Sequence, residues 1–145
     1  MLSPWDNNSV AEVYCSHFLE HLTNFDGRWE RVIFFNELWR IIVPNGTVKL
    51  IFPHWCSTRH YGDPTHKEPF SEMGFFYLDR NWRKQMAPHT DIAHNPKGYD
   101  CHWKCEWGYQ FHDALIPRND EYRNFALQWY KEAAQDVHAT LTALK

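Results

Sequence analysis

Three residues near the start of the chain follow a pattern that binds zinc in some hydrolases. His17, Glu20 and His21 match His-x-x-Glu-His, in which two imidazoles bind the metal and the carboxylate acts as the base. That chemistry needs both histidines on one face of a helix and a third ligand further along the chain. The motif instead directly follows a strand-like run, and residues 18–22 suffice for only about one helical turn. We therefore predict no metal site here and keep a zinc hydrolase only as an alternative.

A second group of possible metal ligands lies between residues 54 and 66. His54, Cys56, His60 and His66 carry suitable side chains, but the group lacks the tight ligand spacing of known metal motifs. The chain has four cysteines, which we expect to be reduced and mostly buried thiols.

Length and charge restrict the classes of function. The chain has 145 residues, a net charge of −3 and a pI near 6.3, which indicates one domain without an electrostatic surface for nucleic acid or anionic membranes. Its pure apolar runs, such as residues 41–43, are too short to cross a bilayer. The first residues lack the basic and apolar regions of a signal peptide, so we expect a cytoplasmic protein.

The elements that must position these side chains begin with a strand, a helix and a second strand. Residues 10–16 are apolar and β-favouring, which is typical of a buried parallel strand. Apolar positions from residue 28 onward follow helical spacing until Pro44 stops the helix. Asn45 and Gly46 favour a tight turn before a second strand over residues 47–52. This order predicts a right-handed parallel crossover unit.

The remainder of the chain is irregular at first and then regular again. Residues 54–100 favour short helices, over 71–78 and 79–85, in a segment of the kind that often forms a functional or lid region. Residues 101–111 alternate between apolar and polar side chains, which predicts a half-buried antiparallel strand. Asn119 is a candidate N-cap of a following helix, and alternation over residues 137–143 predicts a closing strand.

The aromatic content is high, with eight Trp, seven Tyr and ten Phe. Most of these residues occupy predicted core positions, including the apolar stripe of the helix after Asn119 that contains Tyr122, Phe125 and Trp129. We therefore interpret them mainly as packing residues. The exceptions, in the irregular region, are Trp55, Tyr61 and Trp82.

Several segments together resemble the carboxyl-terminal half of a class I S-adenosylmethionine-dependent methyltransferase domain. Residues 2–10 resemble the loop before the fourth strand of that family, and residues 12–21 resemble the strand and the loop after it. Residues 36–46 are similar to the segment before the fifth strand, with Asn45 in place of a glycine. Residues 62–66 resemble a segment of small methyltransferase-like proteins from phage and environmental sequences. Complete relatives also have a Gly-x-Gly loop and an acidic ribose-binding residue, and neither has a counterpart here.

The resemblance implies where S-adenosylmethionine would lie. In this family the cofactor crosses the carboxyl ends of the strands, at the topological switch point of the sheet. By resemblance, Pro4 and Trp5 would lie near the adenine, and Ser16 and His17 near the methionine portion. Pro4 and Trp5 could equally be ordinary loop and core residues.

Methyl transfer also implies a methyl acceptor and in some cases a base. Such a reaction requires in-line positioning and a proton acceptor for some substrates. His54 and His66 are the candidates to face the acceptor, with Asp63 as an orienting partner. The alternative is that Asp63 caps a turn and both histidines are polar surface residues.

The expectation is therefore a single α/β domain over residues 1–145, with a partial Rossmann-like methyltransferase sheet. Parallel strands are followed by an antiparallel carboxyl-terminal strand pair. Without the cofactor-binding half, we expect weak or absent binding of S-adenosylmethionine, and an acceptor that is a small molecule, sugar or lipid. The exposed sheet edge favours a homo-oligomer or an amino-terminal partner. A non-catalytic assembly module that uses this edge is the second alternative.

Overall fold

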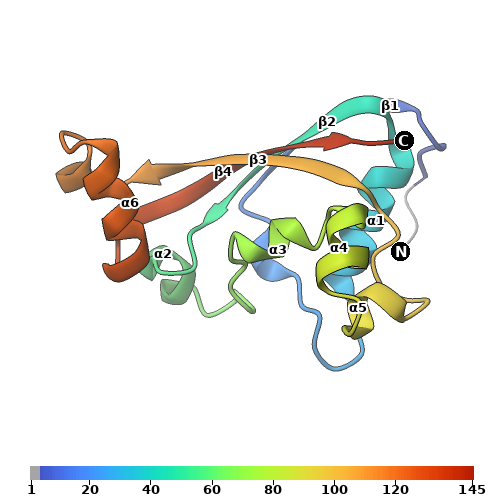
Figure 1. Ribbon diagram of the computed structural model, residues 1–145, viewed down its shortest axis with the longest axis horizontal. Helices are drawn as coiled ribbons and strands as arrows, with labels where there is room; N and C mark the ends of the chain where they lie inside the picture. The colour runs from blue at the N-terminus through green and yellow to red at the C-terminus, as the bar shows by residue number, and fades with distance from the viewer. Residues whose placement is uncertain (1–3) are drawn as a thin grey trace.

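A computed structural model describes residues 4–145, so residues 2 and 3 of the methyltransferase-like motif lie outside the described residues. Helices lie between each strand and the next along the chain (Figure 1). The elements are β1 (Val10–Ser16), η1 (Leu19–His21), α1 (Glu30–Ile41), β2 (Ile42–Pro53), α2 (Thr58–Gly62), α3 (Met73–Phe76), α4 (Arg80–Met86), α5 (Asp91–His94), β3 (Trp103–Phe111), η2 (Asp113–Leu115), α6 (Asp120–Trp129) and β4 (Ala134–Ala143).

The four strands form one mixed sheet in the order β1-β2-β4-β3. Strands β1 and β2 are parallel, whereas β4 is antiparallel to both β2 and β3. The predicted α/β fold class, with parallel strands and an antiparallel carboxyl-terminal pair, is therefore confirmed. Within residues 4–145, no strand pairs with the outer edge of β1.

Strand β2 begins earlier than the sequence predicts. It follows α1 directly at Ile42, and residues 44–46 form an irregularity within the strand rather than a separate turn. Asn45 adopts a φ of 62°, in the left-handed region that asparagine tolerates. A Cβ atom at Gly46 would stand 2.7 Å from the carbonyl oxygen of Ala11, so glycine is required where β2 passes β1.

The core lies on one face of the sheet, where α1, α3 and α4 pack (Figure 1). Alternating side chains of β2 point into it, and helix α1 contributes one apolar stripe. The largest fully buried apolar side chains of this core include Leu19, Phe35, Ile42, Leu50, Phe52, Phe75, Leu78, Trp103 and Leu141. The opposite face carries polar and exposed side chains such as Lys49, Lys104 and His138. The sequence predicts a buried β1, but the strand is partly exposed, and Tyr14 is 64% exposed.

The segment that sequence alone marks as a lid is a packed layer of the core. Phe70 and Phe75 are buried against Phe52 of β2, with ring centroids 5.5 and 6.1 Å from that ring. Short helices occur near the predicted positions as α3 and α4, and α2 and α5 were not predicted. Each is too short to show helical periodicity in the sequence.

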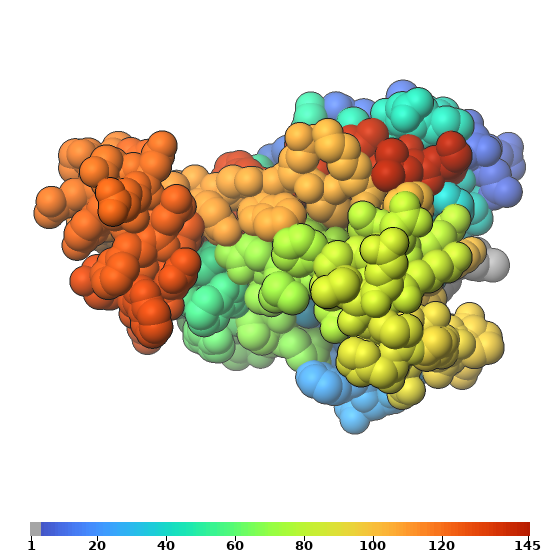
Figure 2. All heavy atoms as spheres, in the orientation of Figure 1, coloured from blue at the N-terminus to red at the C-terminus, as the bar shows by residue number. Residues whose placement is uncertain are grey.

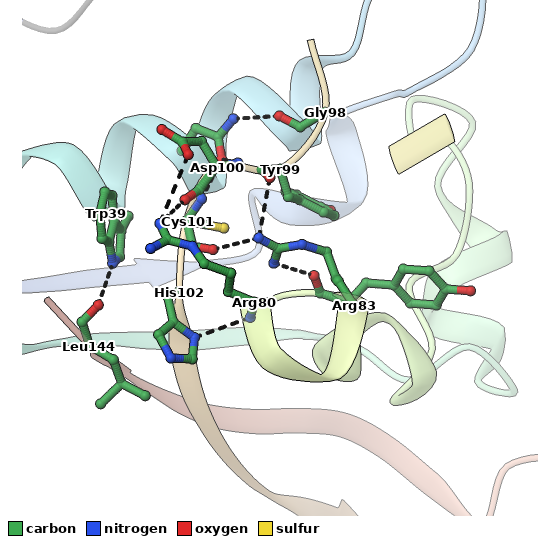
Figure 3. Close-up of polar contacts among 11 residues, drawn as sticks. Trp39, Arg80, Arg83, Gly98, Tyr99, Asp100, Cys101, His102 and Leu144 are labelled. Carbon is green, nitrogen blue, oxygen red and sulfur yellow. Dashed lines mark hydrogen bonds and ion pairs between the residues drawn. The ribbon is translucent and has the colours of Figure 1, made fainter. Parts of the chain in front are cut away.

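Polar contacts, several of them buried, fasten this layer to α1 and to the segment that leads into β3 (Figure 3). The guanidinium of Arg83 in α4 donates to the carbonyl oxygens of Tyr77, Tyr99 and Cys101, at 2.7, 3.2 and 2.8 Å. From α1, the side-chain oxygen of Asn36 accepts from the backbone N–H groups of Asp100 and Cys101. These contacts explain how a segment with little regular structure holds one conformation, because its backbone groups find partners in side chains.

Helix α6 departs most from the prediction. Asn119 is the N-cap, and its side chain accepts from the backbone N–H of Tyr122 at 2.9 Å, as predicted. The apolar stripe of the helix, however, is largely exposed: Phe125 is 50% and Trp129 70% accessible. Figures 1 and 2 show why, because α6 stands at one end of the sheet, away from the helices that cover its face.

All four cysteines are free thiols, with Cys56 and Cys101 buried, as predicted. Burial raises the pKa of Cys101 and of Cys105 to about 12. None of the helices in residues 4–145 combines the length and the apolar character that crossing a bilayer requires.

Candidate functional site

The carboxyl ends of β1 and β2 bring the candidate residues to one edge of the sheet. Ser16 pairs with Ile51, and the backbone N–H of His17 donates to the carbonyl oxygen of Ile51 at 2.8 Å. Strand β2 continues to Pro53, and His54 follows it directly. Because β1 and β2 are parallel, the loops that follow them both leave from this edge.

The chain turns sharply after β1. His17 has a φ of 52°, in the left-handed region that non-glycine residues rarely adopt, and strain of this kind is concentrated at functional sites. Ser16 and His17 are both exposed. Leu19–His21 then forms a single 3-10 turn, as the length of residues 18–22 predicts. The histidines at 17 and 21 therefore do not lie on a common α-helix, which is what the inverted zinc-hydrolase motif requires.

Pro4 and Trp5 line an open groove of about 610 Å³ beside β1 and α1. Val13, Phe18 and Phe34 form apolar parts of the same groove. Trp5 is 59% exposed and its carbonyl oxygen accepts from Arg40, so it is not a core residue. An indole on an apolar, open groove is a suitable surface for a flat ring.

His54 is buried and both of its ring nitrogens have partners. Nε2 lies 2.7 Å from Oε1 of Glu72, and Nδ1 accepts from the backbone N–H of Cys56 at 3.2 Å. Nε2 therefore carries the proton and donates to the carboxylate. Burial by itself raises the pKa of Glu72, but the hydrogen bonds from His54 and neighbouring groups outweigh it and leave that pKa below its ordinary value. Trp55 donates to the second oxygen of Glu72 at 3.1 Å.

Asp63 and His66 lie together in the loop after α2. Nε2 of His66 is 3.7 Å from Oδ2 of Asp63. Asp63 also caps the turn, because its Oδ1 accepts from the backbone N–H of Thr65 at 2.8 Å and from the Thr65 hydroxyl at 2.7 Å. These bonds, the backbone one first, lower the pKa of Asp63. The side chain of His66 is only 9% exposed, so neither this histidine nor His54 is the surface residue that the simpler alternative expects.

The candidate residues thus divide into three groups. The groove holds Pro4 and Trp5, the loop after β1 meets the loop with Asp63 and His66, and His54 belongs to a separate cluster with Glu72. Sequence reasoning missed Glu72 and the role of Thr65. No local pattern marks the contact of Glu72 with His54 or that of Thr65 with His21, because these partners lie on segments distant in the sequence.

Comparisons with known proteins place the fold. No protein-family model and no curated protein matches the sequence. Among solved structures, the chain is similar to an S-adenosylmethionine-dependent methyltransferase from Archaeoglobus fulgidus, with 16% identity and a TM-score of 0.56 over 95% of this chain and 61% of that one. It is also similar to YcgJ from Bacillus subtilis, with 11% identity and a TM-score of 0.52 over 99% of this chain and 68% of that one.

A third similar structure is a complex between the Trm112 methyltransferase activator of Haloferax volcanii and a protein described as a methyltransferase. The identity is 12% and the TM-score 0.51, over 99% of this chain and 58% of that one. The chain thus spans about three fifths of the Archaeoglobus and Haloferax proteins. At these identities the likeness concerns the fold. The chain has the α/β fold of S-adenosylmethionine-dependent methyltransferases, in a partial form with four strands.

Proposed function

We propose that this chain forms the carboxyl-terminal portion of an S-adenosylmethionine-dependent methyltransferase domain. The observation that carries the proposal is the sheet, in which β1, β2 and β3 run in one direction and β4 runs in the opposite direction between β2 and β3, together with its similarity in fold to the Archaeoglobus methyltransferase. Ligands of open α/β sheets bind at the carboxyl ends of the strands, where Ser16 and His17 lie.

In this proposal the groove beside α1 receives the adenine, which stacks on Trp5 next to Pro4. Ser16 and His17 face the methionine portion. The chain has no Gly-x-Gly sequence to approach the cofactor closely, so binding depends on a further segment of polypeptide. That segment would pair with the outer edge of β1, which is free within residues 4–145.

The acceptor is proposed to be a small molecule, sugar or lipid, because the acidic chain lacks a basic surface for nucleic acid. His66, oriented by Asp63, is the candidate base. A role for His54 as a base would require its bond to Glu72 to open, because Nε2 donates there.

The segment that completes the sheet could come from a second copy or from a different protein. The methyltransferase activator in the Haloferax complex supports a protein partner for proteins of this fold. Four free cysteines are compatible with the reducing cytoplasm. The alternative of a non-catalytic assembly module at the β1 edge is less favoured, because similar solved structures are described as methyltransferases.

Calorimetric titration with S-adenosylhomocysteine tests the proposal. The chain alone should show no binding at micromolar concentrations, and a fusion that places a β-α-β unit with a Gly-x-Gly loop before β1 should bind. In that fusion, Trp5→Ala should weaken binding, whereas Trp129→Ala, which truncates an exposed indole on α6, should not. Micromolar binding by the chain alone, or a binding fusion unaffected by Trp5→Ala, would contradict the proposed cofactor site.

A further inference from the structure

Two loops place three metal-binding side chains together at the edge of the sheet. Glu20 and His21 belong to the turn after β1, and His66 belongs to the loop after α2. Each offers one ligand atom, and these atoms lie within 4.8 Å of one another. The backbone N–H of Lys67 donates to the carbonyl oxygen of Glu20 at 2.7 Å and fixes the two loops to each other.

The carboxylate of Glu20 is the least expected member of this cluster. Its side chain is 2% exposed, and neither oxygen has a hydrogen-bond partner among the described residues. Buried polar groups nearly always have partners, because an uncompensated buried carboxylate is costly. A cation between the side chains would supply the missing interaction.

The second histidine of the cluster presents a free lone pair. Nδ1 of His66 lies 2.7 Å from the carbonyl oxygen of His60, which can only accept, so Nδ1 carries the proton. Nε2 is then unprotonated in the neutral ring, and it lies between two carboxylates, 3.9 Å from Oε1 of Glu20 and 3.7 Å from Oδ2 of Asp63. An N–H to backbone carbonyl bond of this kind is the usual way in which proteins orient a metal-binding imidazole.

His21 is oriented in the same manner through two further residues. Its Nδ1 lies 3.3 Å from the hydroxyl oxygen of Thr65, and that hydroxyl donates to Oδ1 of Asp63 at 2.7 Å. The hydroxyl is therefore the acceptor for His21, whose Nδ1 carries the proton. The resulting chain, from imidazole through hydroxyl to carboxylate, leaves Nε2 of His21 available as a ligand.

We propose that Glu20, His21 and His66 bind a divalent transition-metal ion, with zinc as the best match to two imidazoles and one carboxylate. Ligand atoms around a tetrahedral zinc ion stand about 3.3 Å apart, so the cluster closes by about 1.5 Å on binding. The half-buried His21 is free to make that movement. Three protein ligands leave one position for water or for an oxygen of a bound molecule. Because Nε2 is the only basic nitrogen of His66, the zinc-bound chain no longer has His66 as the proposed base of methyl transfer.

This site is distinct from the inverted zinc-hydrolase motif. There, the histidines at 17 and 21 would be ligands and Glu20 the base, whereas here Glu20 is a ligand and His66 replaces His17. The competing explanation for the buried carboxylate is an ion pair with protonated His17, whose Nδ1 lies 3.3 Å from Glu20 Oε1. His17 is half exposed, so removing it tests this explanation directly.

The test is zinc binding by the full chain, freed of metal with a chelator and titrated against a chromophoric zinc competitor. The parent should bind one zinc ion per chain, and a triple variant, Glu20→Gln with His21→Gln and His66→Gln, sets the level of adventitious binding. Each single substitution should weaken binding at least about tenfold. His138→Gln, at an exposed position on β4, is the matched control and should change nothing.

The outcomes separate the explanations. Zinc should raise the thermal midpoint of the parent and of His17→Gln, but not that of His66→Gln. If the parent bound zinc no more tightly than the triple variant, the proposed metal site would be refuted. If His17→Gln weakened zinc binding and His66→Gln did not, the metal would belong to the His17, Glu20 and His21 motif instead. Because the titration uses the metal alone, it stands or fails independently of cofactor binding.

Discussion

Arg83 should be the polar residue on which the irregular layer depends most. It is 3% exposed, and its guanidinium donates to three carbonyl oxygens of the layer, those of Tyr77, Tyr99 and Cys101 (Figure 3). Its planar group also lies over the ring of Tyr99, with the guanidinium carbon 5.7 Å from the centroid. Arg83→Met keeps the volume and the apolar stem but removes every donor.

The size of the effect follows from these bonds. A hydrogen bond to a charged group contributes about 1.5–3 kcal/mol, so three give a gross contribution of several kcal/mol. The cost of removing the guanidinium from water opposes this contribution. The same burial lowers the pKa of Arg83. We expect Arg83→Met to reduce the free energy of unfolding by about 3 kcal/mol, a large part of the 5–15 kcal/mol typical of a domain.

Urea unfolding followed by tryptophan fluorescence measures this loss. With an m-value of about 2 kcal/mol/M, the midpoint should fall by about 1.5 M. Arg83→Lys should be intermediate, because one ammonium group cannot satisfy three carbonyls in fixed directions. Lys84→Met, at an exposed position one residue further along α4, is the matched control and should shift the midpoint little.

Hydrogen exchange locates the effect. Amides of residues 77–101 should lose protection in Arg83→Met more than those of β4, because the layer opens before the sheet. An unchanged urea midpoint, or a loss no larger than that of Lys84→Met, would refute the argument that these three bonds hold the layer.

Three further outcomes are expected. Gly46→Ala should reduce the free energy of unfolding by about 1–3 kcal/mol in thermal denaturation, because its Cβ would stand 2.7 Å from the carbonyl oxygen of Ala11; an unchanged melting temperature would contradict this. The pKa of Glu72, beside His54, is lowered in the folded chain, so ionised Glu72 stabilises the fold above the ordinary value of 4.5, and this stabilisation is lost as the pH falls through the folded pKa. The free energy of unfolding of Glu72→Gln should therefore fall less than that of the parent when both are titrated with acid. Because burial raises the pKa of Cys101 to about 12, this thiol should react with a disulfide reagent at pH 8 only after unfolding, and rapid labelling of the native chain would refute that.

The elements with strong local patterns could be predicted from the sequence. The apolar run of Val10–Ser16, the alternation over Trp103–Phe111 and the N-cap at Asn119 each specify their structure within a few residues. The methyltransferase-like order of these elements then gave the fold class, because connections between successive elements follow few topologies.

Features that depend on distant partners could not be predicted. The stripe of α6 with Phe125 and Trp129 has core-like periodicity, but a helical pattern does not state whether a partner covers it. The orientation of His54 depends on Glu72 and that of His66 on a backbone carbonyl, and neither relation has a sequence signature. Residues 44–46 have the composition of a turn, yet β2 pairs with β1 on both sides of them, at Ile42 and at Thr47, so they lie within the strand as an irregularity.

The position of α6 and the closeness of the two ends of the described chain together permit a rearranged order of the polypeptide. Lys145 donates through Nζ to the side chain of Asn8 and to the carbonyl oxygen of Arg40, so a short linker could join residue 145 to the segment before β1. New ends could then open in the exposed connection between η2 and α6, which follows β3 at the same edge of the sheet as the carboxyl end of β2 (Figure 1). Such a circular permutant would place α6 and β4 at the start of the gene, ahead of β1, and keep every strand pairing of the sheet.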